Sequence, residues 1–190
     1  MTPRITLLDG SLGGAEGNTA AAAARLTAHL EPRASVRAVR LRDTSDAGSL
    51  ASILGDSDGF VFATGTYWDS WGSPMQRFLE TATELEGSLV WLGKPAAVVV
   101  TMHSVGGKGV LSRLQGVLCT LGLLLPPMSG FVYSLANHLA LEGPARDGQE
   151  DLWRLDDLAV VAHNLLEALA GGRDFRAWPV DRAEAGRRWI

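Results

Sequence analysis

Two short runs of the chain are apolar without interruption. Residues 59–63 read Gly-Phe-Val-Phe-Ala, and residues 96–101 read Ala-Ala-Val-Val-Val-Thr. Such runs are typical of strands that are covered on both faces, as in a parallel sheet between two layers of helices. We therefore expect both segments to be central strands. The rest of the chain must then supply the edge strands and the helices for both faces of the sheet.

The other elements alternate between strand and helix patterns. Apolar runs predict strands at residues 5–8, 35–41 and 131–133, and the second of these interleaves valine with arginine, as an edge strand does. Helix signals mark residues 18–30, 50–54, 74–85, 111–121 and 150–169. Because crossovers between parallel strands are right-handed, this alternation predicts an α/β fold with a doubly wound, five-stranded parallel sheet. We expect one domain over residues 1–172, since Gly171 and Gly172 end the last helix.

The composition argues against several classes of function. The formal charge of −4 gives no general attraction to nucleic acid or to an anionic membrane. The most apolar stretch, residues 117–127, is too short to span a bilayer. Cys119 is the only cysteine and the four histidines are scattered, so neither an internal disulfide nor a metal site is expected. The amino terminus lacks the pattern of a secretory signal, and we expect a cytoplasmic protein.

The loop after the first strand, residues 9–19, contains four glycines and opens the first helix. Its backbone N–H groups, together with the side chains of Ser11, Asn18 and Thr19, lie at the positive end of a helix dipole, which favours a bound phosphate. The loop is neither a Walker loop nor a complete GxGxxG motif. A flexible turn in which Asn18 or Thr19 merely caps the helix fits equally well.

Two further loops follow the third and fourth strands, at the edge where ligands of such sheets bind. Residues 64–74 place Tyr67, Trp68 and Trp71 on an exposed turn, which indicates a ring-stacking site or a subunit interface. Alternatively, Tyr67 and Trp68 only cover the end of the sheet. Residues 101–107 combine His103 with two glycines that let a flat ligand approach the backbone, although a lone loop histidine is more often structural.

Taken together, these loops resemble those of the NADPH-dependent FMN reductases, a branch of the flavodoxin-like proteins. The resemblance rests on Gly10-Ser11, Gly17-Asn18-Thr19, the segment 66–74, and His103 with Gly106-Gly107. It covers residues 4–169 and implies the strand order 2-1-3-4-5, FMN as cofactor and NAD(P)H as co-substrate. It also implies a small electron acceptor such as a flavin or quinone, and a homodimer or homotetramer.

By the same resemblance, the FMN phosphate would lie in the first loop and the isoalloxazine ring between the second and third loops. The implied cofactor-binding residues are Ser11, Gly13, Asn18, Thr19, Thr66, Tyr67, Trp68, His103, Ser104, Gly106 and Gly107. No side chain is assigned as a general acid, a general base or a metal ligand, because the flavin carries the redox chemistry.

The first loop carries Glu16 and no Lys or Arg, whereas many members of the resembling family have a basic residue there. Phosphate would therefore depend on backbone N–H groups, hydroxyls and the helix end. We expect any compensating positive charge to come from Arg77 or from the tail, residues 173–190. This tail mixes aromatic residues with five arginines and is expected to pack on its own domain or on a dimer partner, with a disordered end as the alternative.

Two other functions share these loops. A flavodoxin-type electron carrier would bind FMN but receive its electrons from a partner protein. A domain of this fold without a cofactor would serve as an interaction module, and this alternative stays open because the first loop carries Glu16 and no basic residue.

Overall fold

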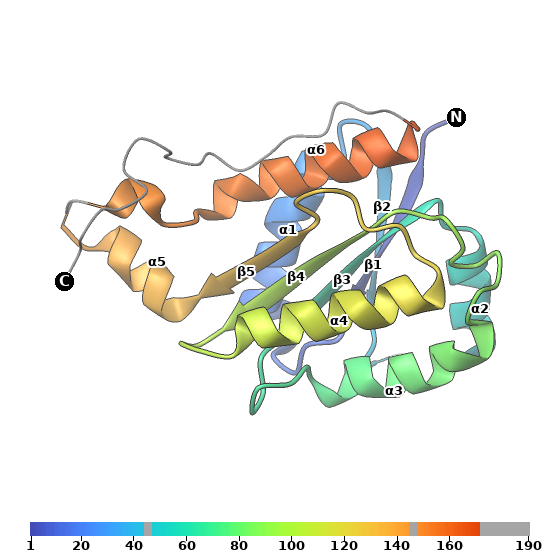
Figure 1. The fold of residues 1–190 in the computed structure, drawn as a ribbon, viewed down its shortest axis with the longest axis horizontal. Coiled ribbons are helices and arrows are strands. Elements are labelled where there is room, and N and C mark those ends of the chain that lie inside the picture. The colour runs from blue at the N-terminus through green and yellow to red at the C-terminus, as the bar shows by residue number, and fades with distance from the viewer. Residues whose placement is uncertain (44–46, 145–147, 172–190) are drawn as a thin grey trace.

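The structure, a computed structural model, describes residues 1–43, 47–144 and 148–171, with the side chains of 47–50 left out. Its sheet consists of five parallel strands, β1 (Arg4–Asp9), β2 (Ser35–Arg40), β3 (Gly59–Gly65), β4 (Ala96–Met102) and β5 (Gly130–Ser134). They lie in the order β2-β1-β3-β4-β5 (Figure 1). The predicted doubly wound sheet and its strand order are confirmed.

Helices cover both faces of this sheet. They are α1 (Asn18–Leu30), α2 (Ala47–Gly55), α3 (Ser73–Ala82), α4 (Gly107–Leu121), α5 (Leu135–Glu142) and α6 (Leu158–Leu169). The helices α1 and α6 pack on one face, while α3 and α4 pack on the other (Figure 1). This arrangement brings the loops that follow β1, β3 and β4 to one edge of the sheet.

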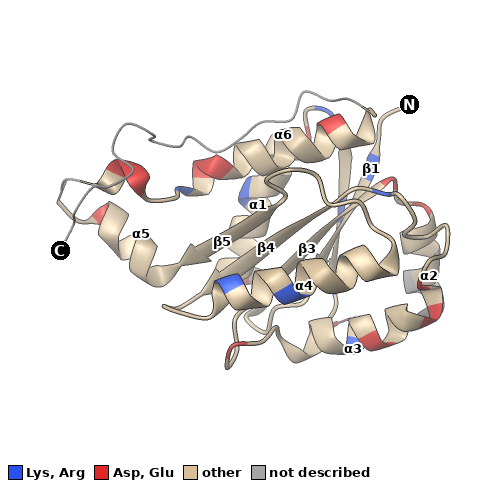
Figure 2. Ribbon diagram, viewed as in Figure 1, with Lys and Arg blue, Asp and Glu red and all other residues tan. Residues whose placement is uncertain are grey.

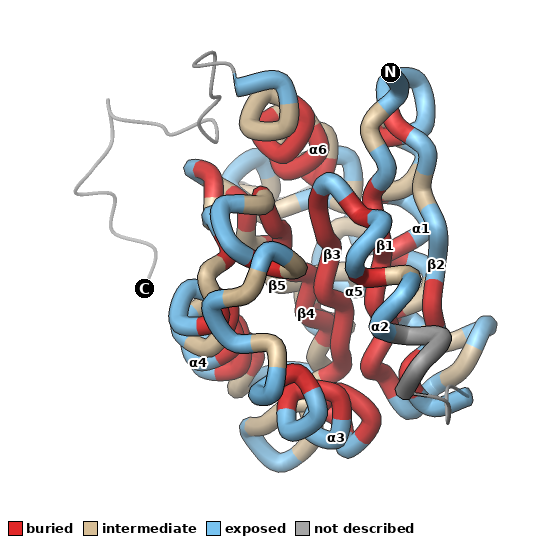
Figure 3. The backbone as a smooth tube through the Cα atoms, turned by 90° about the vertical axis from the view of Figure 1, so that its right-hand side faces the viewer, coloured by how far each residue is buried: buried red, intermediate tan, exposed pale blue. Residues whose placement is uncertain are grey.

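Residues of β3 alternate between two separate cores. Phe60 and Phe62 face α3 and α4, where Phe60 lies against Trp91 with the ring centroids 4.9 Å apart. Val61 and Ala63 face α1 and α6. Every residue of β3 is buried, as the tube in Figure 3 shows, so the strand is central as predicted. The strand β2 lies at the edge of the sheet and is largely exposed, also as predicted.

The prediction of one helix over residues 150–169 is wrong for its first half, which is not α-helical. The helix α6 begins only at Leu158, after short 3-10 turns at Gln149–Asp151 and Leu155–Asp157. The Asp157 carboxylate accepts the Arg154 backbone N–H at 2.7 Å, at the start of the second 3-10 turn. This side-chain contact replaces the hydrogen bond that a continuous helix would make there.

The sequence patterns also fail to predict α5. The Ser134 hydroxyl caps this helix by accepting the Asn137 N–H at 3.0 Å. None of the residues of α5 is buried, so the helix has no apolar stripe by which to recognise it. Residues 173–190, to which a packed tail was assigned, lie outside the described residues.

The charged residues are distributed over the helices and their connections. Acidic positions follow one another between α5 and α6, and basic ones lie on α4 (Figure 2). None of the helices within the described residues is both long and apolar enough to cross a membrane.

Candidate functional site

The first loop folds as a short 3-10 turn, Gly14–Glu16, that leads directly into α1. Gly17 is the residue that caps α1, and no side chain makes a capping hydrogen bond there. The alternative in which Asn18 or Thr19 caps the helix is therefore wrong. Asn18 and Gly13 are exposed beside the turn, as is Glu16.

Ser11 holds an unsatisfied hydroxyl inside the first loop. The residue is 3% exposed, and its N–H donates to Asp9 Oδ1 at 2.9 Å. Its Oγ is buried and has no hydrogen-bond partner among the described residues. Because a buried hydroxyl without a partner costs free energy, this atom is suited to a ligand that supplies the missing hydrogen bond.

Thr19 is turned toward the sheet. Its hydroxyl is hydrogen-bonded to the Thr101 hydroxyl at 2.6 Å, and both residues are buried. The pair joins the start of α1 to the end of β4 and fixes the first loop next to the third. In contrast, no described residue hydrogen-bonds the Asn18 amide, which is free to meet a ligand.

Tyr67 connects the second loop to the first. Its hydroxyl accepts the Leu12 backbone N–H at 3.0 Å, so one first-loop donor is already used by the protein itself. Gly72 also packs against the first loop. Its backbone lies so close to the Gly10 carbonyl oxygen that a Cβ atom on Gly72 would be only 2.6 Å from it. The two loops are packed as one unit.

The tip of the second loop is a tight two-residue turn. Tyr67 and Ser70 exchange both backbone hydrogen bonds, at 2.7 and 2.9 Å. Between them Trp68 and Asp69 have φ values of 49° and 57°, the left-handed conformation of a type I′ turn. The Trp68 side chain is fully exposed, at 102%. Trp68 therefore does not cover the end of the sheet.

Asp69 joins the second loop to the third. Gly106 has a φ of 87°, and a Cβ there would collide with the Asp69 carboxylate. Arg113 on α4 donates to the Asp69 carbonyl, with its guanidinium 5.6 Å from the centroid of the Trp71 ring. The Thr66 hydroxyl is a second buried donor without a partner in the described part of the chain.

The third loop is held at both ends and open in the middle. Gly107 N–H donates to the Met102 sulfur at 3.2 Å, and the His103 carbonyl accepts Ala136 N–H at 3.2 Å. The side chains of His103, Ser104 and Val105 are exposed. The His103 ring makes no hydrogen bond within the described residues, so nothing there supports a structural role for it.

Arg42 is a candidate site residue that the sequence analysis missed. Its Nη1 donates to the Leu12 carbonyl at 2.8 Å, which places a guanidinium beside the first loop. Arg77, the cation proposed from sequence, lies exposed on α3. The pairing of β1 with β2, in register from Arg4 with Ser35 to Asp9 with Arg40, carries the chain after β2 to the chain after β1. A predicted pairing of these two strands would therefore have placed Arg42 beside the first loop.

Tyr133 lies near the carboxyl end of β5, the strand that pairs with β4, and is opposite Thr101. Burial raises the pKa of its phenol above the usual 10.0, and the Asn137 side chain opposes that rise. The hydroxyl is hydrogen-bonded to His138 Nδ1 at 3.1 Å.

We expect the raised pKa to be visible in an alkaline titration. The chain has two tyrosines, so Tyr67→Phe leaves Tyr133 as the only source of tyrosinate absorbance. Its midpoint is expected above the value of about 10 measured in urea. Since the folded state then holds the proton more tightly, stability should fall as pH rises through the interval between the two values. A folded midpoint at or below the urea value would contradict this assignment.

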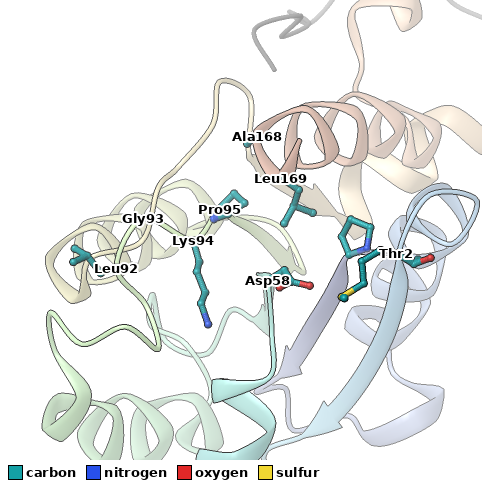
Figure 4. Close-up of a pocket in the computed structure, with 10 residues that line it drawn as sticks. Thr2, Asp58, Leu92, Gly93, Lys94, Pro95, Ala168 and Leu169 are labelled. Atoms are coloured by element: carbon teal, nitrogen blue, oxygen red, sulfur yellow. The ribbon is translucent and has the colours of Figure 1, made fainter. Parts of the chain in front are cut away.

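A hollow of about 470 Å³ lies at the opposite edge of the sheet, at the amino ends of the strands (Figure 4). Asp58, Lys94 and Leu169 line it. Burial lowers the pKa of Lys94, and Asp58 partly offsets this effect. The hollow is remote from the three loops, and ligands of parallel sheets bind at the other edge. Among the described residues no cluster of His, Cys, Asp and Glu is suited to a metal ion.

Residues 3–138, which contain all three loops, match the family model described as NADPH-dependent FMN reductase. No curated protein matches the chain. The structure is similar to RosB with the bound intermediate 8-demethyl-8-formylriboflavin-5'-phosphate, at 15% identity and a TM-score of 0.67, over 99% of this chain and 95% of that one.

Two other solved structures have the same fold. An NADH:FMN oxidoreductase (EMOB) in its apo form is 18% identical, with a TM-score of 0.64 over 91% of each chain. The Flv1 flavodiiron core from Synechocystis is 17% identical, with a TM-score of 0.64 over 90% of this chain. The chain spans only 36% of the length of that flavodiiron core. At these identities the likeness is one of fold.

Proposed function

Because the chain belongs to the NADPH-dependent FMN reductase family, we propose that it is an FMN-dependent NAD(P)H oxidoreductase whose final acceptor is a small molecule such as a flavin or a quinone. The observation that carries the proposal is the pair of buried hydroxyls without partners, on Ser11 and Thr66. One lies in the loop expected to hold phosphate, and the other in the loop expected to hold the ring.

The first loop would bind the FMN phosphate. Ser11 Oγ would donate to a phosphate oxygen and recover its missing hydrogen bond, and the Asn18 amide would donate from the start of α1. Arg42 would supply positive charge that the loop itself lacks, although its Nε also lies 3.7 Å from Asp43 Oδ1. The Arg42 guanidinium donates to the Leu12 carbonyl, which places it beside the first loop. Its electrostatic attraction would therefore reach a phosphate bound in the loop from the side.

The second and third loops would hold the isoalloxazine ring. The Thr66 hydroxyl and the backbone N–H groups of Trp68 and Gly106 would hydrogen-bond its polar edge and favour the electron-rich reduced form. Gly106 and Gly107 let the third loop pack closely on Asp69, Met102 and Val132, because a Cβ at either position would collide with one of these side chains. When bound, FMN supplies the hydride-accepting and electron-donating chemistry. The protein positions the ring and leaves Trp68, His103 and Val105 exposed around it.

A spectrum and an activity measurement test this proposal. The purified protein is expected to be yellow, or to bind added FMN, and then to oxidise NADH or NADPH with a quinone or free flavin as acceptor. Rapid reduction of the bound flavin by NAD(P)H without a partner protein would distinguish the enzyme from an electron carrier. Protein that neither contains nor binds FMN would contradict the proposal and favour the interaction module.

We also propose that two chains associate near the site. The apolar side chains of Trp68, Val105 and Leu12 are exposed around the three loops, and such residues favour an interface. The domain would comprise residues 1–172, with residues 173–190 packing on it or on the second chain. Light scattering on the purified protein gives the number of chains.

Replacing Arg42 with methionine is expected to weaken FMN binding by about tenfold, the effect of removing one partly exposed charge near a phosphate. The loss should shrink as salt is added, because salt screens the charge. Calorimetric titration at low and high ionic strength measures both effects. Arg77→Met, an exposed arginine on α3, is the matched control. Equal affinity of the two variants would remove Arg42 from the site.

A further inference from the structure

A pocket of about 220 Å³ lies on the α1 side of the sheet, next to the third loop. It is bordered by Asn18, Ala21, Met102, Tyr133, His138 and Leu155. Of the residues given a role in FMN binding above, only Asn18 borders this pocket, and no part of the flavin ring is placed in it. Most of its wall is apolar, and the few polar groups converge from α1, β5 and α5, which is the composition of a site for a small organic ligand.

The volume limits what the pocket can hold. Apolar cavities of about 150 Å³ in proteins accept a benzene molecule. A pocket of about 220 Å³ therefore has room for one substituted benzene ring, whereas the three-ring system of a flavin is too large.

A chain of hydrogen bonds orients the polar end of the pocket. Glu142 Oε1 lies 3.2 Å from His138 Nε2, and His138 Nδ1 lies 3.1 Å from the Tyr133 hydroxyl. In a neutral imidazole whose Nε2–H faces the carboxylate, Nδ1 accepts the tyrosine proton. The Tyr133 oxygen then offers a lone pair to the pocket, and this atom is suited to a ligand that donates an O–H group.

The Tyr133 ring is fixed in place from behind. It stacks on Phe131 with the centroids 6.0 Å apart and the planes 12° from parallel, and Phe131 is fully buried. A hydroxyl held this firmly binds its partner with little loss of side-chain entropy. Across the pocket, the Asn18 amide is not hydrogen-bonded by any described residue, and in the flavin-free protein it provides a second polar contact.

From this geometry we propose that the pocket binds a monocyclic hydroxyaromatic molecule, with its hydroxyl on Tyr133 and its ring against Ala21, Met102 and Leu155. Met102 is shared with the third loop, since its sulfur accepts Gly107 N–H. A molecule in the pocket thus lies next to the proposed flavin site. Insofar as the inference concerns catalysis, it rests on the proposed function, because one class of hydroxyaromatic, the dihydroxybenzenes, is the reduced form of a monocyclic quinone acceptor.

Binding of p-cresol and of toluene to the flavin-free protein tests the proposal, with affinities measured by ligand-observed NMR. Wild-type protein is expected to bind both ligands and to prefer p-cresol. Tyr133→Phe should weaken p-cresol binding about tenfold and leave toluene unchanged, because it removes one hydrogen bond and keeps the ring.

Ala21→Leu provides a second variant that fills the pocket from α1. It should weaken both ligands by at least about tenfold, while Ala24→Leu, at an exposed alanine of the same helix that does not border the pocket, should bind like wild type. Failure of wild type to bind p-cresol, or equal binding by the two leucine variants, would overturn the inference. FMN titration of the same samples separates the two proposals, because p-cresol binding does not require flavin.

Discussion

Ser11→Asp is expected to abolish FMN binding while sparing riboflavin. The substitution puts a carboxylate where a buried hydroxyl now lacks a partner, on the residue whose own N–H already donates to Asp9 Oδ1. Juxtaposing a carboxylate with a phosphate dianion in such a place costs several kcal/mol, which corresponds to a loss of roughly 100-fold or more in affinity. Riboflavin has no phosphate, so its weaker binding through the ring should survive.

The comparison of the two flavins makes this experiment specific. Calorimetric titration of Ser11→Asp, Ser11→Ala and wild type with FMN and with riboflavin separates repulsion from damage to the fold. Ser11→Ala should lose only about tenfold for FMN, the effect of one hydrogen bond to a charged group. Ser73→Asp, at an exposed serine, is the control for added charge. If Ser11→Asp bound FMN as tightly as wild type, the phosphate would have to lie outside the first loop.

The central strands and the three loops were predictable because each has a local signal. The run at 59–63 is apolar on both faces, so it had to be covered on both sides. Chain order and the handedness of crossovers then bring the loops after β1, β3 and β4 to one edge. The placement of the loops follows from these few features, whereas the strand order was implied by the resemblance to the FMN reductases.

What the sequence did not reveal depends on contacts between segments. Arg42 reaches the first loop because two strands pair in register, and its own neighbours in sequence give no sign of that role. The helix α5 buries no residue, so it leaves no periodic pattern. The break before α6 depends on one carboxylate turning back to the Arg154 N–H, where the leucine spacing alone favours a continuous helix.

Tyr67 illustrates how such contacts alter the interpretation of a motif. From sequence it is one of several aromatics suited to stacking on a ring. In the folded chain its hydroxyl holds the Leu12 N–H, and its ring packs against Gly65 and Gly72. Its first effect is therefore to fix the distance between the first and second loops. A cofactor that spans both loops depends on that distance.

Gly72→Ala is accordingly expected to impair both stability and FMN binding. Gly72 has φ −67° and ψ 151°, values that alanine adopts without strain, so the cost arises from contact alone. The new Cβ would lie 2.6 Å from the Gly10 carbonyl oxygen. Gly10 cannot retreat, because its N–H is bonded to the Ala63 carbonyl at 2.8 Å and its own Cα faces the Met75 side chain. Overpacking of this kind costs about 1–3 kcal/mol.

Gly116→Ala gives the opposite result from the same chemical change. Gly116 is exposed in the middle of α4, and a Cβ there would meet nothing within 4 Å. Alanine should therefore stabilise the protein by up to about 1 kcal/mol through helix propensity. Thermal unfolding is expected to move down for Gly72→Ala and up for Gly116→Ala, and only Gly72→Ala should lose FMN affinity, by more than about tenfold. If both variants bound FMN like wild type, a fixed distance between the first two loops would not be needed to hold the cofactor.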